Sequence, residues 1–233
     1  MAVLVGGAAV LHRVSGVGFA FIAFPVLIVV YGPVEGLTIG FLLGLAVSVL
    51  LMAQSWRDVM LRRALQLSLP AIVTVPIGAW LVHLASPDVL TVCVGTFLLF
   101  SLYAARRGWS LVLGGGSTVV TGAAAGFAHV TSGLSVPVLT SYAISTGWKQ
   151  ERFAASCQVI FVIFNVGSLV ALGVTSTGLI SAARLLPVAL LGSLLGLYLQ
   201  GRFSSEAAQR LVVVVAAASA IAAMVQGALG LSG

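Results

Sequence analysis

Charged side chains are scarce in this sequence. Lys and Arg together number 11 and Asp and Glu number 5, which is 7% of 233 residues, whereas 60% of the residues are hydrophobic. A soluble domain carries about 25% charged residues, so this chain cannot cover a water-exposed surface. Several apolar runs approach the ~20 residues that cross a bilayer as a helix, and the short alternating strands of a membrane barrel are missing. We therefore expect an all-α polytopic membrane protein.

Acidic residues and cysteines are rarer still. Cys93 and Cys157 have no CxxC or Cys/His spacing, so we expect small core residues and neither a disulfide nor a metal site. The sequence has no HExxH or GxSxG motif either, and we predict that the chain is not an enzyme and needs no cofactor. No acid lies in the middle of a predicted span, which argues against a carboxylate proton relay or cation site. The acids, all at predicted helix ends or in loops, are Glu35, Asp58, Asp88, Glu151 and Glu206.

Apolar runs bounded by charge, Pro or Gly predict eight segments. The first and the fifth contain polar interruptions, at His12–Gly18 and at His129–Gly133. Residues 110–147 are too long for one crossing but suit two shorter helices that meet at a break. The predicted segments are 2–31, 34–54, 65–84, 88–105, 110–147, 153–174, 184–200 and 207–229.

The two sets of four segments match at an offset of about 117 residues. His12-x-x-Ser15-Gly16 falls on His129-x-x-Ser132-Gly133, and Pro70 falls on Pro187. Several landmarks recur in the same order, which predicts a duplicated half. We expect repeats at 1–108 and 109–233, and transporters built from such repeats bind substrate where the halves meet near the membrane midplane.

Loop charges favour an inverted arrangement of the repeats. If each interrupted segment crosses the bilayer once, the Lys and Arg residues divide six to four between the two sides. If each one enters and returns to the same side, as a broken or re-entrant helical hairpin, they divide nine to one, which the positive-inside rule prefers. Only Arg184 then lies outside, and the inner side holds Arg57, Arg62, Arg63, Arg106, Arg107, Lys149, Arg152, Arg202 and Arg210. The net charge of +6 thus sets membrane orientation and does not indicate nucleic-acid binding.

The two interruptions predict an anion site. Irregular backbone at membrane depth is tolerated where protein or a water-filled cavity satisfies its polar groups. A new helix is expected to begin near Ser15 and near Thr131 or Ser132, because Ser and Thr are good N-caps, and helix N-termini favour anions. The predicted substrate-binding residues are His12, Arg13, Ser15, Gly16, His129, Thr131, Ser132, Gly133 and Asn165.

Other interpretations of these residues stay open at this point. Gly, Ser and Thr are common where transmembrane helices pack, so the interruptions would then be packing features. Arg13 would extend to water if its break lies near the surface. Asn165, in the middle of a predicted span, either hydrogen-bonds across helices or lines the substrate path.

Three stretches resemble the sulfite exporter TauE/SafE permeases of the toluene-sulfonate uptake permease superfamily. They read SGVGFAFIAFPVLIVVYGPVEGLTIGFLLGL, GAAAGFAHVTSGLSVPVLTSYAISTGWKQERFAASCQVIFVIFNVGSL and LLPVALLGSLLGLYLQGRFSSEAAQRLVVVV. Many members have a Gly-Gly-Pro type of turn where this chain has Ser132-Gly133-Leu-Ser135-Val-Pro137. The resemblance implies a multi-pass permease for small sulfur-containing anions, such as sulfite or sulfonates, in a prokaryotic plasma membrane.

We expect alternating access around the two broken segments, in the direction of export. A monovalent anion that leaves a cell at −100 mV gains about 2.3 kcal/mol, so export needs no coupled ion. The expected partners are a small anion and the lipid bilayer, and a homo-oligomer is possible. The alternative is a structural or assembly subunit that transports nothing.

Overall fold

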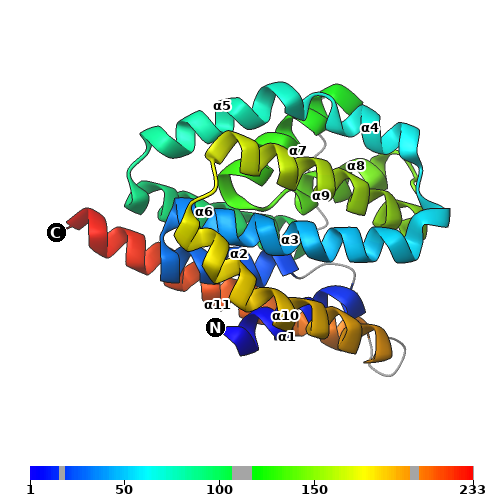
Figure 1. Ribbon diagram of the computed structural model, residues 1–233. Helices are drawn as coiled ribbons and strands as arrows, with labels where there is room; N and C mark the ends of the chain where they lie inside the picture. The colour runs from blue at the N-terminus through cyan, green and yellow to red at the C-terminus, as the bar shows by residue number, and fades with distance from the viewer. Residues whose placement is uncertain (16–18, 107–116, 200–204, 233) are drawn as a thin grey trace.

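The computed structural model describes residues 1–15, 19–106, 117–199 and 205–232. Within these ranges the chain is helical apart from short connections and contains no strand, which confirms the all-α class (Figure 1). The elements are α1 Ala2–Ser15, α2 Phe19–Tyr31, α3 Pro33–Ser55, η1 Trp56–Asp58, α4 Leu61–Ser68, α5 Ala71–Leu84, α6 Pro87–Arg106, α7 Thr118–Ser132, α8 Val136–Ser145, α9 Gln150–Leu172, α10 Ser176–Leu199 and α11 Ser205–Ser232.

The described part contains 5 helices that are long and apolar enough to cross a membrane, namely α3, α6, α9, α10 and α11. A sixth candidate span is the pair α4–α5, which bends by 42° at Leu69 and Pro70. The fold is therefore that of a multi-pass helical membrane protein. Glu35 and Glu151 lie in the first turns of α3 and α9, where a helix dipole favours a carboxylate.

Two pairs of shorter helices interrupt this pattern. The pair α1 and α2 and the pair α7 and α8 each contain helices of at most 15 residues, too short to span the ~20-residue hydrocarbon core. The hydroxyls of Thr118 at the start of α7 and Tyr142 near the end of α8 lie 2.8 Å apart. The pair α7–α8 is therefore a closed hairpin whose two outer ends lie together (Figure 1).

The breaks lie later in the chain than the sequence predicted. Ser15 is the last residue of α1, and α2 begins at Phe19, so an N-cap at Ser15 is wrong. In the second pair α7 continues through His129 to Ser132, and α8 begins after Ser135, so an N-cap at Thr131 or Ser132 is also wrong. Thr and Ser are tolerated inside α7 because both hydroxyls bond to carbonyl oxygens one turn earlier.

Two other expectations need correction. Helix α10 begins at Ser176 rather than near residue 184, so Arg184 lies exposed within the helix and not in the preceding loop. Cys157 is buried as expected, but Cys93 is exposed on α6 and is not a core residue. The predicted repeat boundary at residues 108 and 109 falls outside the described residues.

The helix pattern of the first half recurs in the second. Helix α9 spans Gln150–Leu172, so both its bounds lie 117 positions after those of α3, Pro33–Ser55. The packing is reciprocal, because α1 packs against α10 while α7 packs against α4 and α5, and α3 and α6 pack against their own counterparts, α9 and α11. The helices of each half therefore pack against those of the other half.

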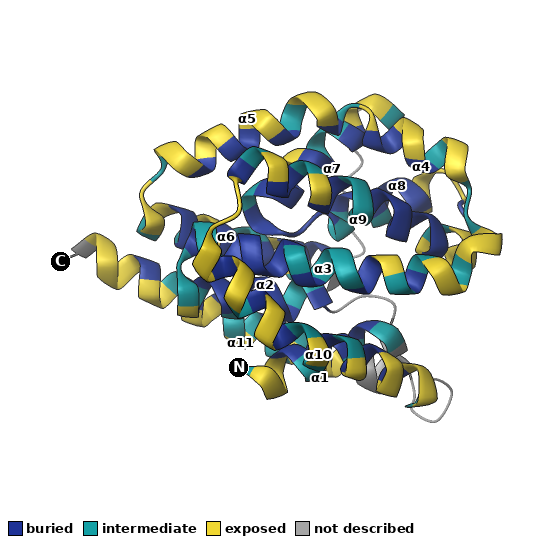
Figure 2. Cartoon of the chain, in the orientation of Figure 1, coloured by how far each residue is buried: buried dark blue, intermediate teal, exposed yellow. Residues whose placement is uncertain are grey.

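The paired counterparts run in opposite directions. Gly44 in α3 faces Asn165 in α9, whereas Met60 beyond α3 donates its backbone N–H to Ser156 nearer the start of α9, at 2.9 Å. Gly95 of α6 likewise faces Ala220 of α11, and Asp88 faces Gly227. Both pairs are thus antiparallel. Buried residues concentrate where α2, α3 and α9 meet (Figure 2).

Glycines bring α1 and α10 into close contact. A Cβ built on Gly192 would lie 2.5 Å from the carbonyl oxygen of Gly6, whereas a Cβ on Gly7 has nothing within 4 Å. Small residues of this kind let membrane helices approach at backbone distance. The packing of the first hairpin on α10 therefore depends on a hydrogen at position 192.

We expect Gly192→Ala to lower the free energy of unfolding by about 1–3 kcal/mol, because backbone must move to admit the methyl group. Gly7→Ala is the matched control, since it adds the same group in open space and should be neutral or slightly stabilising. Unfolding in mixed micelles at increasing denaturing detergent measures both. Equal stabilities of the two variants would contradict this account of the contact.

Candidate functional site

The two hairpins meet at a small, partly open cavity of about 40 Å³, between α3 and α9. Its polar lining consists of His12, Ser48, His129, Ser135 and Asn165, and Gly133 also contributes. His12 and His129 are 117 positions apart, as are Ser48 and Asn165. The cavity is therefore lined by corresponding positions of both halves, and it lies where those halves meet.

His129 is fixed by two hydrogen bonds. Its Nε2 lies 3.2 Å from Oδ1 of Asn165, and its Nδ1 lies 3.1 Å from Oγ of Ser135. Because Oδ1 only accepts, Nε2–H donates to it, and in the neutral ring the Ser135 hydroxyl donates to Nδ1. The side chain of Asn165 comes from α9 and Ser135 from the turn before α8, so the imidazole ties the hairpin tip to a spanning helix.

Aromatic rings surround this histidine. Phe41 stacks on the imidazole at 5.0 Å between centroids, and Phe161 lies parallel at 6.3 Å. Phe164 at 5.3 Å and Phe24 at 6.5 Å approach it at steeper angles. His129 is only 3% exposed. It is therefore a tightly held part of the cavity wall.

His12 lies in a different environment. It is 9% exposed, it lines the same cavity, and its Nδ1 has no hydrogen-bond partner among the described residues. Its ring contact is a single edge-on approach to Phe19, at 6.5 Å. A buried polar atom without a partner costs free energy, so this nitrogen has free capacity for a ligand or a water molecule.

The structure separates the other predicted residues into two groups. Gly133 and Asn165 line the cavity with the two histidines, whereas Thr131 and Ser132 do not. Thr131 donates to the carbonyl of Phe127 at 2.8 Å, and its methyl group faces Gly78 of α5. Ser132 donates to the carbonyl of Ala128 at 2.6 Å. Both hydroxyls are thus engaged within α7.

The first interruption is described only in part. Gly16 lies outside the described residues, as does the side chain of Ser15. Arg13 is partly exposed, and its Cβ and Cγ pack where a Cβ of Gly196 would lie, so its stem faces α10 and not the cavity. Its Nε is buried without a hydrogen-bond partner among the described residues.

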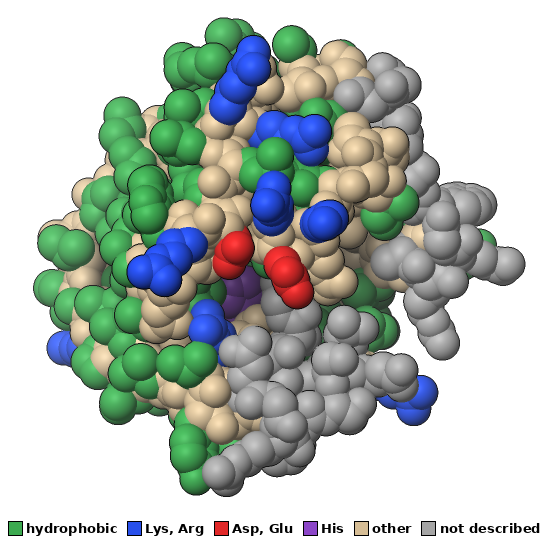
Figure 3. Space-filling view, turned by 90° about the vertical axis from the view of Figure 1, so that its right-hand side faces the viewer, with side chains coloured by type: hydrophobic (Ala, Val, Ile, Leu, Met, Phe, Trp, Pro, Cys, Tyr) green, Lys and Arg blue, Asp and Glu red, His purple; other side chains and the backbone are tan. Residues whose placement is uncertain are grey.

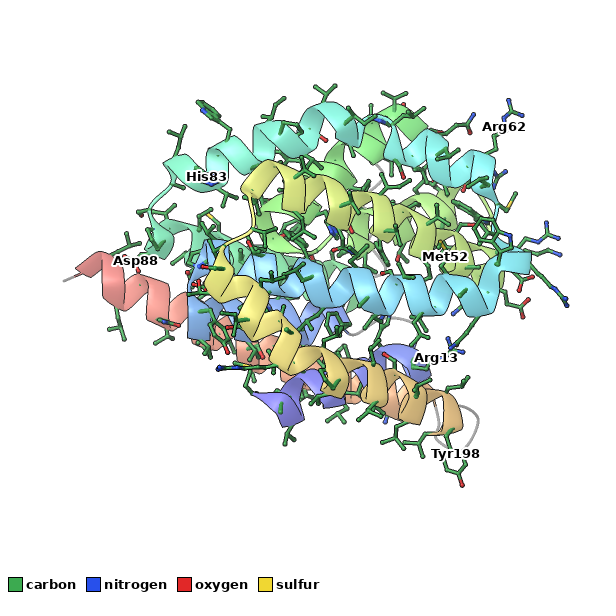
Figure 4. All side chains as sticks on the ribbon, viewed as in Figure 1. Arg13, Met52, Arg62, His83, Asp88 and Tyr198 are labelled. Carbon is green, nitrogen blue, oxygen red and sulfur yellow. The ribbon has the colours of Figure 1, made fainter. Side chains whose placement is uncertain are left out.

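Charge is concentrated at one end of the bundle. Figure 4 places Arg62 at that end, with His83 and Asp88 at the opposite end. Arg57, Arg62 and Arg63 on η1 and α4 approach the start of α9, which carries Lys149 and Arg152, because α4 and η1 pack on α9. We call this face the basic face. Figure 3 views it directly and shows Lys and Arg side chains around two acidic side chains, with a histidine beside the acids.

The described residues include no cluster of three His, Cys, Asp or Glu side chains that could hold a metal ion. The arrangement that does occur is a buried set of neutral donors and acceptors with no carboxylate in the lining. Such a set can replace part of the hydration shell of a small polar molecule or anion.

A family model described as sulfite exporter TauE/SafE matches residues 1–223 of the 233. The chain belongs to this family. Its members are membrane transporters of the sulfite exporter type, so the chain is a multi-pass transport protein rather than a member of an enzyme family. No curated protein and no solved structure matches the chain.

Sequence reasoning missed Ser135 as a partner of His129 and the phenylalanines that enclose the ring. The offset of 117 offered one signal, because it pairs Ser48 with Asn165 and Gly44 with Phe161, and all four line the cavity. Nothing in the sequence pattern marks Phe24 or Phe41, since apolar residues surround both of them.

Proposed function

We propose that this TauE/SafE protein exports small sulfur-containing anions, such as sulfite or a sulfonate, through the cavity between its hairpins. The observation that carries the proposal is the central position of His12, Ser48, His129 and Asn165, two pairs of corresponding residues in one buried cavity. Transporters built from repeats bind substrate at this kind of interface. Family membership supplies the class of substrate.

The asymmetry of charge supports export. The basic face carries five Lys and Arg residues and two acids, Asp58 and Glu151, and its net positive charge raises the local concentration of anions. By the positive-inside rule this face is cytoplasmic, in a prokaryotic plasma membrane. An anion that enters from that side then moves down the membrane potential, which supplies about 2.3 kcal/mol per 100 mV.

The mechanism that fits this arrangement is alternating access with inverted repeats. Helices α3 and α9 run antiparallel. If a two-fold axis relates them, that axis is perpendicular to both helices. Because both helices span the membrane, the axis then lies in the membrane plane. Each half then consists of a re-entrant hairpin and three spans. Because three is an odd number, the second half begins on the opposite side of the membrane and is inverted.

Accessibility of single cysteines tests this topology. In a Cys93→Ser background, Ser86→Cys reports the loop between α5 and α6, and Gln150→Cys reports the start of α9; both positions are exposed. We expect the two cysteines to react with an impermeant maleimide from opposite sides of the membrane. Parallel repeats, in which each hairpin counts as one crossing, place them on the same side, and that result would rule out inversion.

Flux in proteoliposomes tests the function itself. The purified chain is expected to release loaded sulfite faster than protein-free vesicles do, and an imposed potential that drives anions outward should increase the rate. A pH gradient made by changing the external pH alone, at constant internal pH, should add little, because no coupled ion is needed. If folded protein gives no flux of sulfite or of any sulfonate in a panel, the chain is better explained as a structural or assembly subunit.

A further inference from the structure

We propose that the cavity selects the singly charged, protonated form of a small inorganic oxyanion, hydrogen sulfite for example, over the doubly charged form. The proposal rests on the anion transport proposed above and specifies the charge state that the site takes. It concerns three properties of the cavity, namely its charge, its hydrogen-bonding groups and its size.

No Lys, Arg, Asp or Glu side chain lines the cavity among the described residues. The titratable groups that face it are His12 from α1 and His129 from α7, and the lining from α2, α3, α8 and α9 has none. Arg13 turns its stem toward α10. The cost of burying an ion grows with the square of its charge, so a dianion costs about four times as much as a monoanion, and no fixed cation offsets it here.

The hydrogen-bonding groups suit a ligand that both donates and accepts. Asn165 uses Oδ1 to accept from His129, which leaves its amide NH₂ as the donor that it can offer to the cavity. Ser135 donates to His129, so the lone pairs of its oxygen can accept. Hydrogen sulfite has negatively charged oxygens for the amide and an O–H for Ser135, whereas the dianion has no proton to donate.

The size of the cavity points the same way. About 40 Å³ holds roughly three water-sized groups, at ~12 Å³ each. A space of this size favours a compact oxyanion over an aryl sulfonate, which is much larger. The walls that set this limit include the buried side chains of Phe24 and Val47.

Three anions in proteoliposomes separate the possible outcomes. Sulfite gains or loses a proton near neutral pH, chlorate has the same pyramidal shape but is a monoanion throughout, and sulfate is a dianion throughout. Above the pKa of hydrogen sulfite we expect sulfite flux to fall about tenfold per pH unit, in step with the monoanion fraction. Chlorate flux should stay constant, and sulfate should not move.

Each contrary result has its own meaning. Sulfite flux that rises with pH, or sulfate flux equal to sulfite flux, would overturn the proposal while leaving anion transport intact. A chlorate profile that follows the sulfite profile would assign the pH dependence to His12 or His129 and would also overturn it. If none of the anions moves, the proposed function itself fails.

A variant tests the acceptor directly. Ser135→Ala should lower the ratio of hydrogen sulfite flux to chlorate flux about tenfold, because chlorate has no O–H to donate and so loses nothing at this position. Ser193→Ala is the control, since its hydroxyl donates to Ala189 within α10, away from the cavity lining. Because the readout is a ratio of two fluxes, a lower yield of folded variant does not affect it. An unchanged ratio would contradict the role of Ser135.

Discussion

Gly133→Ala is expected to give a protein that is less stable by about 2–5 kcal/mol and has lost transport. Gly133 has φ +75° and ψ +2°, the left-handed conformation, which costs a residue with a Cβ about 1–2 kcal/mol. A Cβ there would also overlap ring atoms of Phe24, which is itself 2% exposed. Overpacking of this kind adds about 1–3 kcal/mol.

The control for Gly133 is Gly147→Ala. Gly147 also has a positive φ, +60°, but a Cβ there meets nothing within 4 Å, so this variant measures the backbone cost alone. Urea or detergent unfolding of both variants gives the difference that belongs to Phe24. If Gly133→Ala costs no more than Gly147→Ala, the contact between hairpin tip and α2 is not tight.

A double-mutant cycle then assigns the overlap to its partner. In a Phe24→Ala background the ring is absent, so Gly133→Ala should cost only the backbone term. The expected coupling energy is about 1–3 kcal/mol, in the direction of relief. Two independent costs that simply add would show that the methyl group is accommodated elsewhere.

Removal of the two histidines is expected to lower the free energy of unfolding by different amounts. His129→Ala takes away two hydrogen bonds and the ring that Phe41, Phe161 and Phe164 pack against, so we expect a loss of about 3–5 kcal/mol of stability. His12→Ala removes a side chain whose Nδ1 has no partner among the described residues, and we expect a loss below about 1.5 kcal/mol.

His12→Ala should have a large effect on sulfite binding and transport although its effect on stability is small. A ligand at 100 times its Kd stabilises a protein by about 2.7 kcal/mol, so saturating sulfite should raise the melting temperature of the parent chain in detergent. In His12→Ala this increase should disappear, and sulfite flux should fall at least tenfold, while the ligand-free melting temperature changes little. The increase should survive in His83→Ala, because His83 lies at the end of the bundle opposite the basic face (Figure 4).

A different pattern would change the assignment of the site. If His12→Ala keeps the sulfite-dependent increase in melting temperature, the unpartnered nitrogen is not the ligand-binding group. If both histidine variants lose the same free energy of unfolding without sulfite, His129 does not stabilise the fold more than His12 does.

The sequence by itself determined the class of the protein and the position of its polar interruptions. Sixteen charges on 233 residues force the chain into a membrane, and apolar lengths near 20 residues fix helices as its spans. The recurrence of His-x-x-Ser-Gly after 117 residues marked both hairpins and brought His12 and His129 into the predicted site, and Asn165 was included for its position in the middle of a predicted span. These features follow from the composition of the chain and from the spacing of residues along it, and neither depends on tertiary contacts.

Only the tertiary structure decided what each polar residue does. Helix α7 continues through Ser132, and the Ser132 hydroxyl donates to the carbonyl oxygen of Ala128 one turn earlier. This hydrogen bond can form only if the helix continues, and no local pattern at Ser-Gly specifies that. The difference between His12 and His129 comes from Asn165, 36 positions away from His129, and from phenylalanines on α2, α3 and α9. Such contacts join segments far apart in the chain, so packing alone makes one repeated histidine part of the wall and leaves the other with a nitrogen that no described residue bonds.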